Sequence, residues 1–367
     1  MKTLWLYAGT QKTATTAVQH FLTANRAVLA ERGVSFPDMS DLFDKTNNYR
    51  NANWLTRYKL LGERTREGFE RIEGLLDECG TVILSDERLW RNVFDQAEFF
   101  DFVKAGFSAD TNIKVLVFLR RQDQFLYSCW AQAVKVRPAK EESHLEFLDY
   151  IARRWEVEEK VLDYAHRLAV VEEGIGIENM VVRTYDPKRY EGTGASIVDD
   201  FLEAIGIDSE GEWASPEEMF NESMRDVVLE TRRLMNREVA TAHLEFGGGG
   251  TELRRALLYV QRELEEEGLL GRRTGFPDEK RREMMERYAE GNATVARRYL
   301  GREDGVLFDC TDIEEGTGGE AMRPYTNEEI VQVLTRVSGR LASKLDRVGR
   351  KARGRGTGDV GTEAEDD

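Results

Sequence analysis

Four short apolar runs alternate with stretches of helical periodicity in the first part of the chain. The runs lie at residues 3–8, 80–85, 113–119 and 179–185. They are nearly continuous in apolar character, which is typical of strands buried on both faces of a parallel sheet. The helical stretches between them lie at residues 15–29, 64–79, 98–106, 123–136 and 145–172. This alternation predicts an α/β domain in which helices flank a parallel sheet.

Beyond about residue 210 the periodicity is helical only. It covers residues 215–239, 251–268, 278–299 and 327–348, and four glycines at 247–250 separate two of these stretches. The sequence therefore predicts an α/β core over 1–210 and a mainly helical extension over 211–350. We expect the extension to complete the domain and to offer a surface for an acceptor or a partner. Residues 351–367 are rich in glycine and charge, which predicts a disordered tail.

Charge narrows the function classes. The 367 residues carry a formal net charge of −16, which argues against nucleic acid as the main partner, because a phosphate backbone demands a basic surface. An anionic ligand would need a local positive site. The four histidines lack the spacing of metal ligands, so we expect no metal site.

The compartment is also predicted from the sequence. No run approaches the roughly 18 apolar residues of a membrane span. The apolar start is five residues long, shorter than the roughly 7–15 of a secretory signal peptide. The three cysteines are far apart and form no CxxC pair, which favours free thiols in a reducing compartment. We expect a cytoplasmic protein.

The loop after the first predicted strand has the composition of an anion site. Its residues are Gly9, Thr10, Gln11, Lys12, Thr13, Ala14, Thr15 and Thr16. A strand–loop–helix junction presents backbone N–H groups and the positive end of the helix to an anion, and the threonine hydroxyls and Lys12 add donors. It is not a Walker A loop, because no glycine stands beside the lysine. The alternative interpretation is a tight turn with a solvated lysine.

A second candidate site follows the third apolar run. Arg120 leaves the carboxyl end of this predicted strand, where open α/β sheets bind ligands, and Asp123 can cap the next helix. Ser128 stands eight residues after Arg120, on that helix. An arginine and a hydroxyl from adjacent elements can converge on one phosphate. The alternative is an arginine that ends a strand and a serine that faces solvent.

Together, the stretches GTQKTATT and LRRQDQFLYS resemble the sulfotransferase family that uses 3′-phosphoadenosine 5′-phosphosulfate (PAPS). The wider stretches look most like bacterial members that modify carbohydrates or related acceptors. The family's 5′-phosphosulfate loop has lysine, Ser or Thr, glycine and two threonines, and residues 12–16 match it with Ala14 in place of glycine. Its 3′-phosphate site pairs an arginine with a serine eight positions later, as Arg120 and Ser128 are spaced. The resemblance covers roughly residues 1–210 and implies a P-loop-like fold.

The resemblance also suggests a nucleobase contact. Some residues of the family's pattern are absent from this chain. A tyrosine at the end of a late strand touches adenine in some members, and Tyr185 occupies the similar position. Ordinary packing of a strand-end tyrosine is the alternative. The aromatic residue that follows the threonine pair in the animal cytosolic branch is Ala17 here, and that branch's late RKG segment has no clear match. Other residues must therefore supply part of the contacts with the nucleotide.

The family chemistry would be in-line transfer of the sulfuryl group from PAPS to a hydroxyl or amine, leaving adenosine 3′,5′-bisphosphate without help from a metal. Lys12 would stabilise the charge that grows on the leaving phosphate oxygen. The acceptor must lose a proton, so a base is needed. Glu87, just past the second apolar run, is the first candidate, and Asp86 and His20 are rivals. Acidic residues also favour the first turn of a helix, which is the structural alternative.

Two other functions remain open from the sequence. A P-loop-like nucleotide kinase would need the Walker A motif and a clear Walker B aspartate at the end of an apolar run such as 113–119, and the chain has neither. A non-catalytic nucleotide-binding or scaffolding module would not need Lys12, Arg120 and Ser128 together.

Overall fold

The computed structural model describes residues 2–10, 13–43, 49–136, 140–190, 196–214, 224–242, 250–270, 276–314 and 324–355, with the backbone alone at 61, 250 and 349–355. The chain divides into two compact units. Unit 1 comprises Met1–Cys129, Ile151–Phe220 and Asp278–Glu315, and unit 2 comprises Trp130–Tyr150, Asn221–Pro277 and Gly316–Asp367. Both units thus draw on chain from before and after residue 210.

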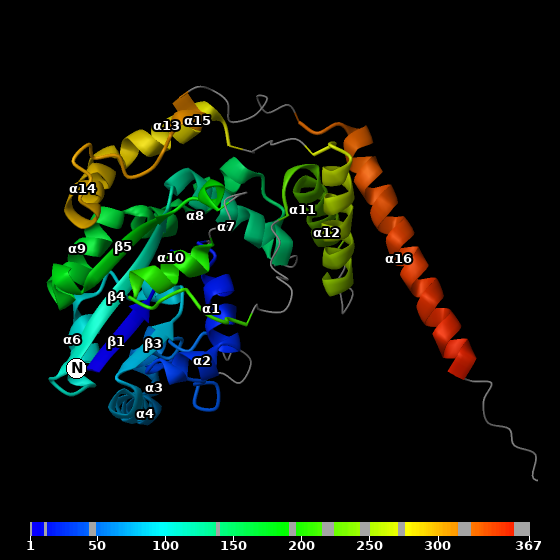
Figure 1. The fold of residues 1–367 in the computed structure, drawn as a ribbon. Coiled ribbons are helices and arrows are strands. Elements are labelled where there is room, and N and C mark those ends of the chain that lie inside the picture. The colour runs from blue at the N-terminus through cyan, green and yellow to red at the C-terminus, as the bar shows by residue number, and fades with distance from the viewer. Residues whose placement is uncertain are drawn as a thin grey trace, which may run out of the picture. The chain divides into compact units, whose positions relative to one another are not determined.

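A five-stranded parallel sheet forms the centre of unit 1 (Figure 1). The strands are β1 Lys2–Tyr7, β2 Val34–Ser35, β3 Thr81–Ser85, β4 Thr111–Arg120 and β5 Met180–Tyr185, and their order across the sheet is β2-β3-β1-β4-β5. The four predicted strands are confirmed. The two-residue edge strand β2 was missed because it is too short to produce a pattern of its own.

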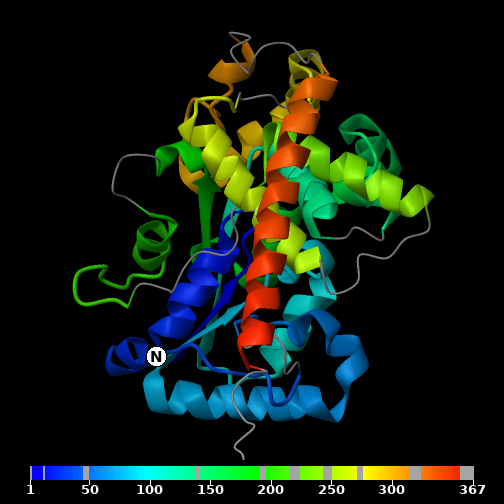
Figure 2. The ribbon, with the colours of Figure 1, turned by 90° about the vertical axis from the view of Figure 1, so that its right-hand side faces the viewer.

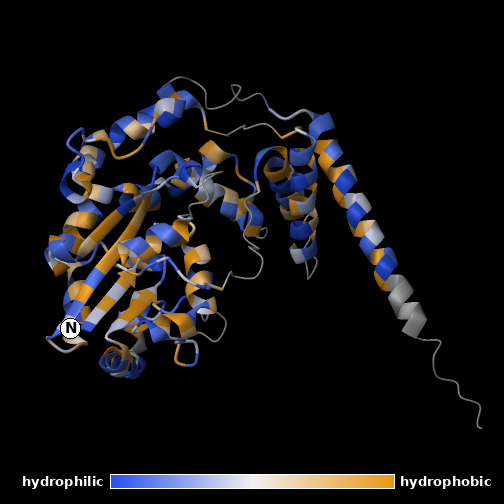
Figure 3. Ribbon diagram, viewed as in Figure 1, coloured by the Kyte–Doolittle hydropathy of each residue, from blue (hydrophilic) through white to orange (hydrophobic). Residues whose placement is uncertain are grey.

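Apolar side chains on both faces of the sheet explain why its strands are continuous apolar runs. On one face Trp5, Tyr7 and Phe118 pack in a single core with residues of α1 (Thr15–Ala24) and α10 (Ile197–Ala204). Successive side chains of a strand point to opposite faces, so Leu4 and Leu6 lie on the other face, and both are fully buried. There α9 (Tyr164–Ile175) packs on α6 (Ala97–Ala105) and contacts β4 and β5. Figure 3 shows the central strands mostly in the hydrophobic colour.

The predicted α/β class with helices flanking a parallel sheet is therefore correct. The other α-helices outside the helical cluster of unit 2 are α2 Arg26–Glu31, α3 Tyr58–Leu61, α4 Glu63–Cys79, α5 Arg88–Asn92, α7 Gln122–Val136, α8 Phe147–Leu162, α13 Asp278–Arg287, α14 Ala289–Leu300 and α15 Thr311–Glu314. None of the helices in the described ranges is long and apolar enough to cross a membrane.

Three predicted helical stretches are interrupted. The stretch at 278–299 is divided at Tyr288 into α13 and α14, and the other two breaks have a side-chain cause. The stretch at 145–172 is two helices, because the Asp163 carboxylate accepts a hydrogen bond from the His166 amide and begins α9. The stretch at 15–29 breaks at Asn25. Its side-chain amide donates to the Phe21 carbonyl (2.9 Å) and pairs in both directions with the backbone of Ala214.

Unit 2 is helical, as the sequence predicts for the later part of the chain. Its helices α11 (Asp226–Thr241), α12 (Gly250–Glu266) and α16 (Asn327–Arg355) pack against one another. Buried Leu257 and Val333 contribute to this core, and Arg336 forms an ion pair with Glu267 at 2.7 Å. Figure 2 shows α16, in red, as one continuous helix. It includes the first five residues of the predicted tail, and residues 356–367 lie outside the described ranges.

Candidate functional site

The loop between β1 and α1 is tied to the neighbouring strand β4. The amide of Thr10 donates to the Phe118 carbonyl at 2.9 Å, and the Thr10 hydroxyl donates to the same oxygen at 3.0 Å. The Thr13 hydroxyl donates to the Thr10 carbonyl at 2.7 Å. A hydroxyl has one proton, so in this geometry Thr10 and Thr13 build the loop and do not donate to a ligand.

Two positions of this loop have special backbone requirements. A Cβ on Gly9 would lie 2.6 Å from the hydroxyl oxygens of both Thr13 and Thr15, so the loop closes over a residue without a side chain. Ala14, which precedes α1, has φ 54° and ψ 23°, in the left-handed region. The sulfotransferase-like pattern has glycine at this position, and the left-handed backbone gives the physical reason for that glycine.

The amino end of α1 supplies the anion-binding groups of the loop. The amides of Ala17 and Val18 donate to the Ala14 carbonyl. Helix geometry leaves the amides of Thr15 and Thr16 without a carbonyl acceptor in the helix, at the positive end of its dipole. Gln11 and Lys12 lie outside the described residues, so the roles expected of them stay predictions.

Arg120, Ser128 and Tyr185 come together at the ends of β4 and β5. The Arg120 guanidinium donates to the Ser128 hydroxyl at 3.1 Å and lies over the Tyr185 ring, 5.6 Å from its centre. In the parallel ladder Arg120 is directly opposite Tyr185. The pKa of Arg120 is lowered and that of Tyr185 is raised, in both cases chiefly by burial. The eight-residue spacing therefore brings a desolvated cation and a hydroxyl side by side.

The loop and Arg120 belong to the same edge of the sheet. Strands β1 and β4 are adjacent and parallel, so their carboxyl ends meet there. The bond from Thr10 to Phe118 brings the loop to a point two residues before Arg120. Two separate groups of hydrogen-bond donors thus line one edge.

Two carboxylates, Asp86 and Glu87, directly follow β3, the strand that pairs with β1 on the other side from β4. Ser85, the last residue of β3, is opposite Tyr7 of β1 in the ladder, so the following residues reach the same edge. Asp86 is fully buried, and its Oδ1 accepts from the Arg50 guanidinium at 2.8 Å. Its Oδ2 is buried without a hydrogen-bond partner among the described residues. Such an oxygen is costly unless water or a ligand donates to it.

Glu87 shares the same arginine. Its carboxylate lies 3.2 Å from Arg50, and its side chain is 27% exposed. Although burial opposes it, the charges of Asp86 and Glu87 raise the pKa of Arg50. His20 is exposed on α1 and packs against the Tyr49 ring at 4.7 Å. Of the three candidate bases, Asp86 and Glu87 therefore lie together, and Glu87 is the more accessible of these two carboxylates.

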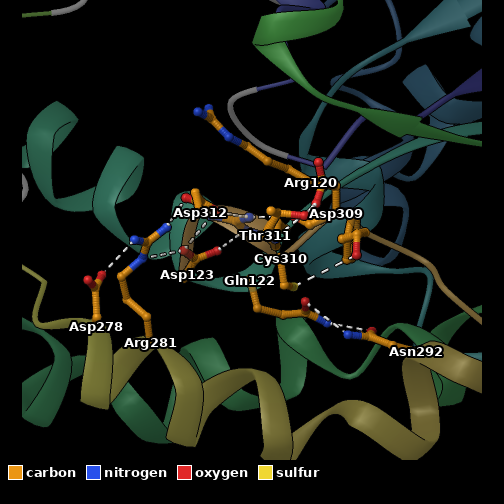
Figure 4. Close-up of polar contacts among 12 residues, drawn as sticks. Arg120, Gln122, Asp123, Asp278, Arg281, Asn292, Asp309, Cys310, Thr311 and Asp312 are labelled. Carbon is orange, nitrogen blue, oxygen red and sulfur yellow. Dashed lines mark hydrogen bonds and ion pairs between the residues drawn. The ribbon is translucent and has the colours of Figure 1, made fainter. Parts of the chain in front are cut away.

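One buried cluster was not anticipated from the sequence. Asp123 lies in the first turn of α7 instead of before it, and it pairs with Arg121 (2.8 Å) and Arg281 (2.8 Å). Asp312 pairs with the same two arginines, at 2.6 and 2.7 Å (Figure 4). Its members come from chain segments up to 191 residues apart, so no local pattern connects them. Among the side chains described, no group of His, Cys, Asp or Glu could hold a metal ion.

Comparison with known proteins gives a weak similarity among solved structures. No protein-family model and no curated protein sequence matches the chain. Among solved structures, the chain is similar to a sulfotransferase from Alicyclobacillus acidocaldarius, with 14% sequence identity and a TM-score of 0.39. The match covers 66% of this chain and 96% of that one.

The loop geometry predicts opposite effects for two small substitutions. Gly9→Ala should lower the free energy of unfolding by about 1–3 kcal/mol, because its Cβ overlaps two buried hydroxyls. Ala14→Gly should raise it by about 0.5–1 kcal/mol, because glycine removes the left-handed penalty, partly offset by its greater freedom in the unfolded chain. Urea denaturation of the two variants beside the parent chain measures both. Destabilisation by Ala14→Gly would contradict this description of the loop.

Proposed function

We propose that the protein transfers a sulfuryl group from PAPS to a hydroxyl or amine of an acceptor, with a carbohydrate or related metabolite as the acceptor class. The observation that carries the proposal is the pairing of two anion-binding groups at one sheet edge. One is the β1–α1 loop with the amino end of α1, and the other is Arg120 with Ser128. PAPS is an adenosine with separate anions at its 5′ and 3′ positions, which matches a site with two such groups.

Each group has a role in holding the donor. The amides of Thr15 and Thr16, with Lys12, bind the 5′-phosphosulfate at the positive end of α1. Arg120 and Ser128 bind the 3′-phosphate through charge-assisted hydrogen bonds. Tyr185, which already packs under Arg120, is available to contact adenine. The partly buried position of Arg120 favours this role, because a desolvated guanidinium gains more from an anion than a solvated one does.

The reaction balances without a further reactant. The acceptor oxygen or nitrogen forms a bond to sulfur as the bond from sulfur to the 5′-phosphate oxygen breaks, and adenosine 3′,5′-bisphosphate leaves. Negative charge grows on that phosphate oxygen, where the helix amides and Lys12 stabilise it. The acceptor proton passes to a carboxylate.

We take Glu87 as that base because an acceptor must reach it. Glu87 is partly exposed, whereas Asp86 is fully buried and holds Arg50 in contact with both carboxylates. Asp86 would then position Arg50, and through it Glu87. The open Oδ2 of Asp86 can accept a hydrogen bond from an ordered water or from the acceptor itself.

Ligand binding separates this function from its alternatives. Adenosine 3′,5′-bisphosphate in EDTA should raise the melting temperature by at least ~2 °C at a hundredfold excess over Kd, since ligand that binds only the folded state adds about 2.7 kcal/mol. Mg-ATP and AMP should have much smaller effects, which differential scanning fluorimetry measures. A shift with Mg-ATP alone would favour a nucleotide kinase. No shift with any nucleotide would contradict the proposal.

The base assignment has its own test, which uses labelled PAPS and an accepted sugar substrate. Glu87→Gln keeps the shape of the side chain and removes its basicity, so kcat should fall by roughly 10²–10⁴-fold while donor affinity stays unchanged. The matched variant His20→Asn, at an exposed position of α1, should keep the parental rate. The reverse pattern, with Glu87→Gln fully active and His20→Asn inactive, would assign the base to His20.

A further inference from the structure

Arg121, Asp123, Arg281 and Asp312 form a closed charge network inside unit 1. Arg121 contacts Asp123 through Nε and Nη2 (2.8 and 3.1 Å) and Asp312 through Nη1 and Nη2 (2.6 and 2.9 Å). Arg281 donates to Asp123 at 2.8 Å and to Asp312 at 2.7 Å. Each carboxylate thus bridges both guanidinium groups, and Asp278 also accepts a hydrogen bond from Arg281 at 2.9 Å.

The network is more buried and more fixed in its geometry than a surface ion pair. Arg121, Asp123 and Arg281 are at most 6% exposed, and Asp312 is 21% exposed. The two arginines hold the pKa of the Asp312 carboxyl well below its usual range, against the opposing effect of burial. Bidentate arginine–carboxylate pairs fix orientation as well as distance, so the network holds the backbone of its members in one arrangement.

Both residues proposed to bind the 3′-phosphate, Arg120 and Ser128, are connected through the backbone to members of this network. Arg120 directly precedes Arg121, and Figure 4 shows its side chain pointing away from Asp123 and Asp312. Ser128 lies on α7, whose first turn contains Asp123. The network therefore fixes the strand end that carries Arg120 and the helix that carries Ser128.

Such an attachment matters because arginine is a long, flexible side chain. Immobilising it costs conformational entropy, and an arrangement that is already ordered before binding reduces this cost for the ligand. The Tyr164 hydroxyl adds a further restraint by donating to the Arg120 carbonyl at 2.6 Å. A partly buried guanidinium 3.1 Å from its serine partner is a preorganised receptor for a phosphate.

We propose that Arg281 and Asp312 are positioning residues for recognition of the 3′-phosphate, an inference that rests on the proposed function. They come from α13 and α15, far along the chain, and act on the ligand through Arg121 and Asp123. Removing one carboxylate leaves two buried arginines facing the other, and the strand end that carries Arg120 loses part of its fixed geometry.

The test measures dissociation constants by calorimetry for adenosine 3′,5′-bisphosphate and for AMP, which lacks the 3′-phosphate. Asp312→Asn should weaken bisphosphate binding by roughly tenfold or more and AMP binding by much less, because small misplacements of a binding group have effects of this order. Arg281→Lys keeps the positive charge and loses the bridging fork, so it should act in the same direction. It serves as the second variant if Asp312→Asn does not fold.

A matched control separates positioning from general destabilisation. Asp95 pairs with the buried Arg167 at 3.0 Å, elsewhere in unit 1. Asp95→Asn should lower stability and leave the ratio of the two dissociation constants unchanged. In the Arg120→Ala background, Asp312→Asn should add much less further loss of bisphosphate affinity, because the charged member of the pair that it positions is gone.

The outcomes distinguish a failure of the positioning role from a failure of the proposed function. If the parent chain prefers the bisphosphate and both network variants keep that preference in full, the positioning role is overturned and the proposed function stands. If the losses caused by Asp312→Asn and Arg120→Ala simply add, the positioning role is also overturned. If the parent chain shows no preference for the 3′-phosphate, both the function and the positioning role fail.

Discussion

The parallel pairing of β1 with β4 is the interaction on which the candidate site depends. It brings the carboxyl ends of the two strands to one edge, and the bond from the Thr10 amide to the Phe118 carbonyl fixes the loop against the end of β4. A shift in register would move the loop along β4, away from its position two residues before Arg120, and a one-residue slip would turn side chains to the opposite face. The apolar residues that bury both faces hold this register, so the core determines the distance between the two anion-binding groups.

The proposed nucleotide site must overcome the charge of a chain whose formal net charge is −16. An anionic nucleotide is repelled by the overall charge, so attraction has to come from local groups that work at short range. In the proposed function, this attraction comes from the amino end of α1 and from the partly buried Arg120. Arg121, next to Arg120, has its charge balanced by Asp123 and Asp312, so two consecutive arginines have different roles.

Much of the fold could be predicted from the sequence, because buried parallel strands and amphipathic helices leave local patterns. The residues 113–119 are an example, since their uninterrupted apolar character predicts a strand covered on both faces, and β4 is such a strand. The breaks at Asn25 and Asp163 could not be predicted from periodicity, since a single side chain that bonds the backbone decides them.

The candidate site was predictable only where its members are close in sequence. The eight-residue spacing of Arg120 and Ser128 predicts their contact, and the structure has it. The pairing of Asp86 and Glu87 with Arg50 depends on a segment more than thirty residues earlier, and the contacts of Arg121 with Asp312 span 191 residues. Contacts of that range depend on tertiary packing and leave no spacing to detect.

A crystal structure with adenosine 3′,5′-bisphosphate tests the central claim most directly, since it locates both anions at once and shows the position of Lys12. We expect the 3′-phosphate oxygens to lie within hydrogen-bond distance, about 2.7–2.9 Å, of the Arg120 guanidinium and near the Ser128 hydroxyl. The 5′-phosphate should lie at the amides of Thr15 and Thr16. A nucleotide bound away from this edge, or one whose 3′-phosphate makes no contact with Arg120, would contradict the assignment.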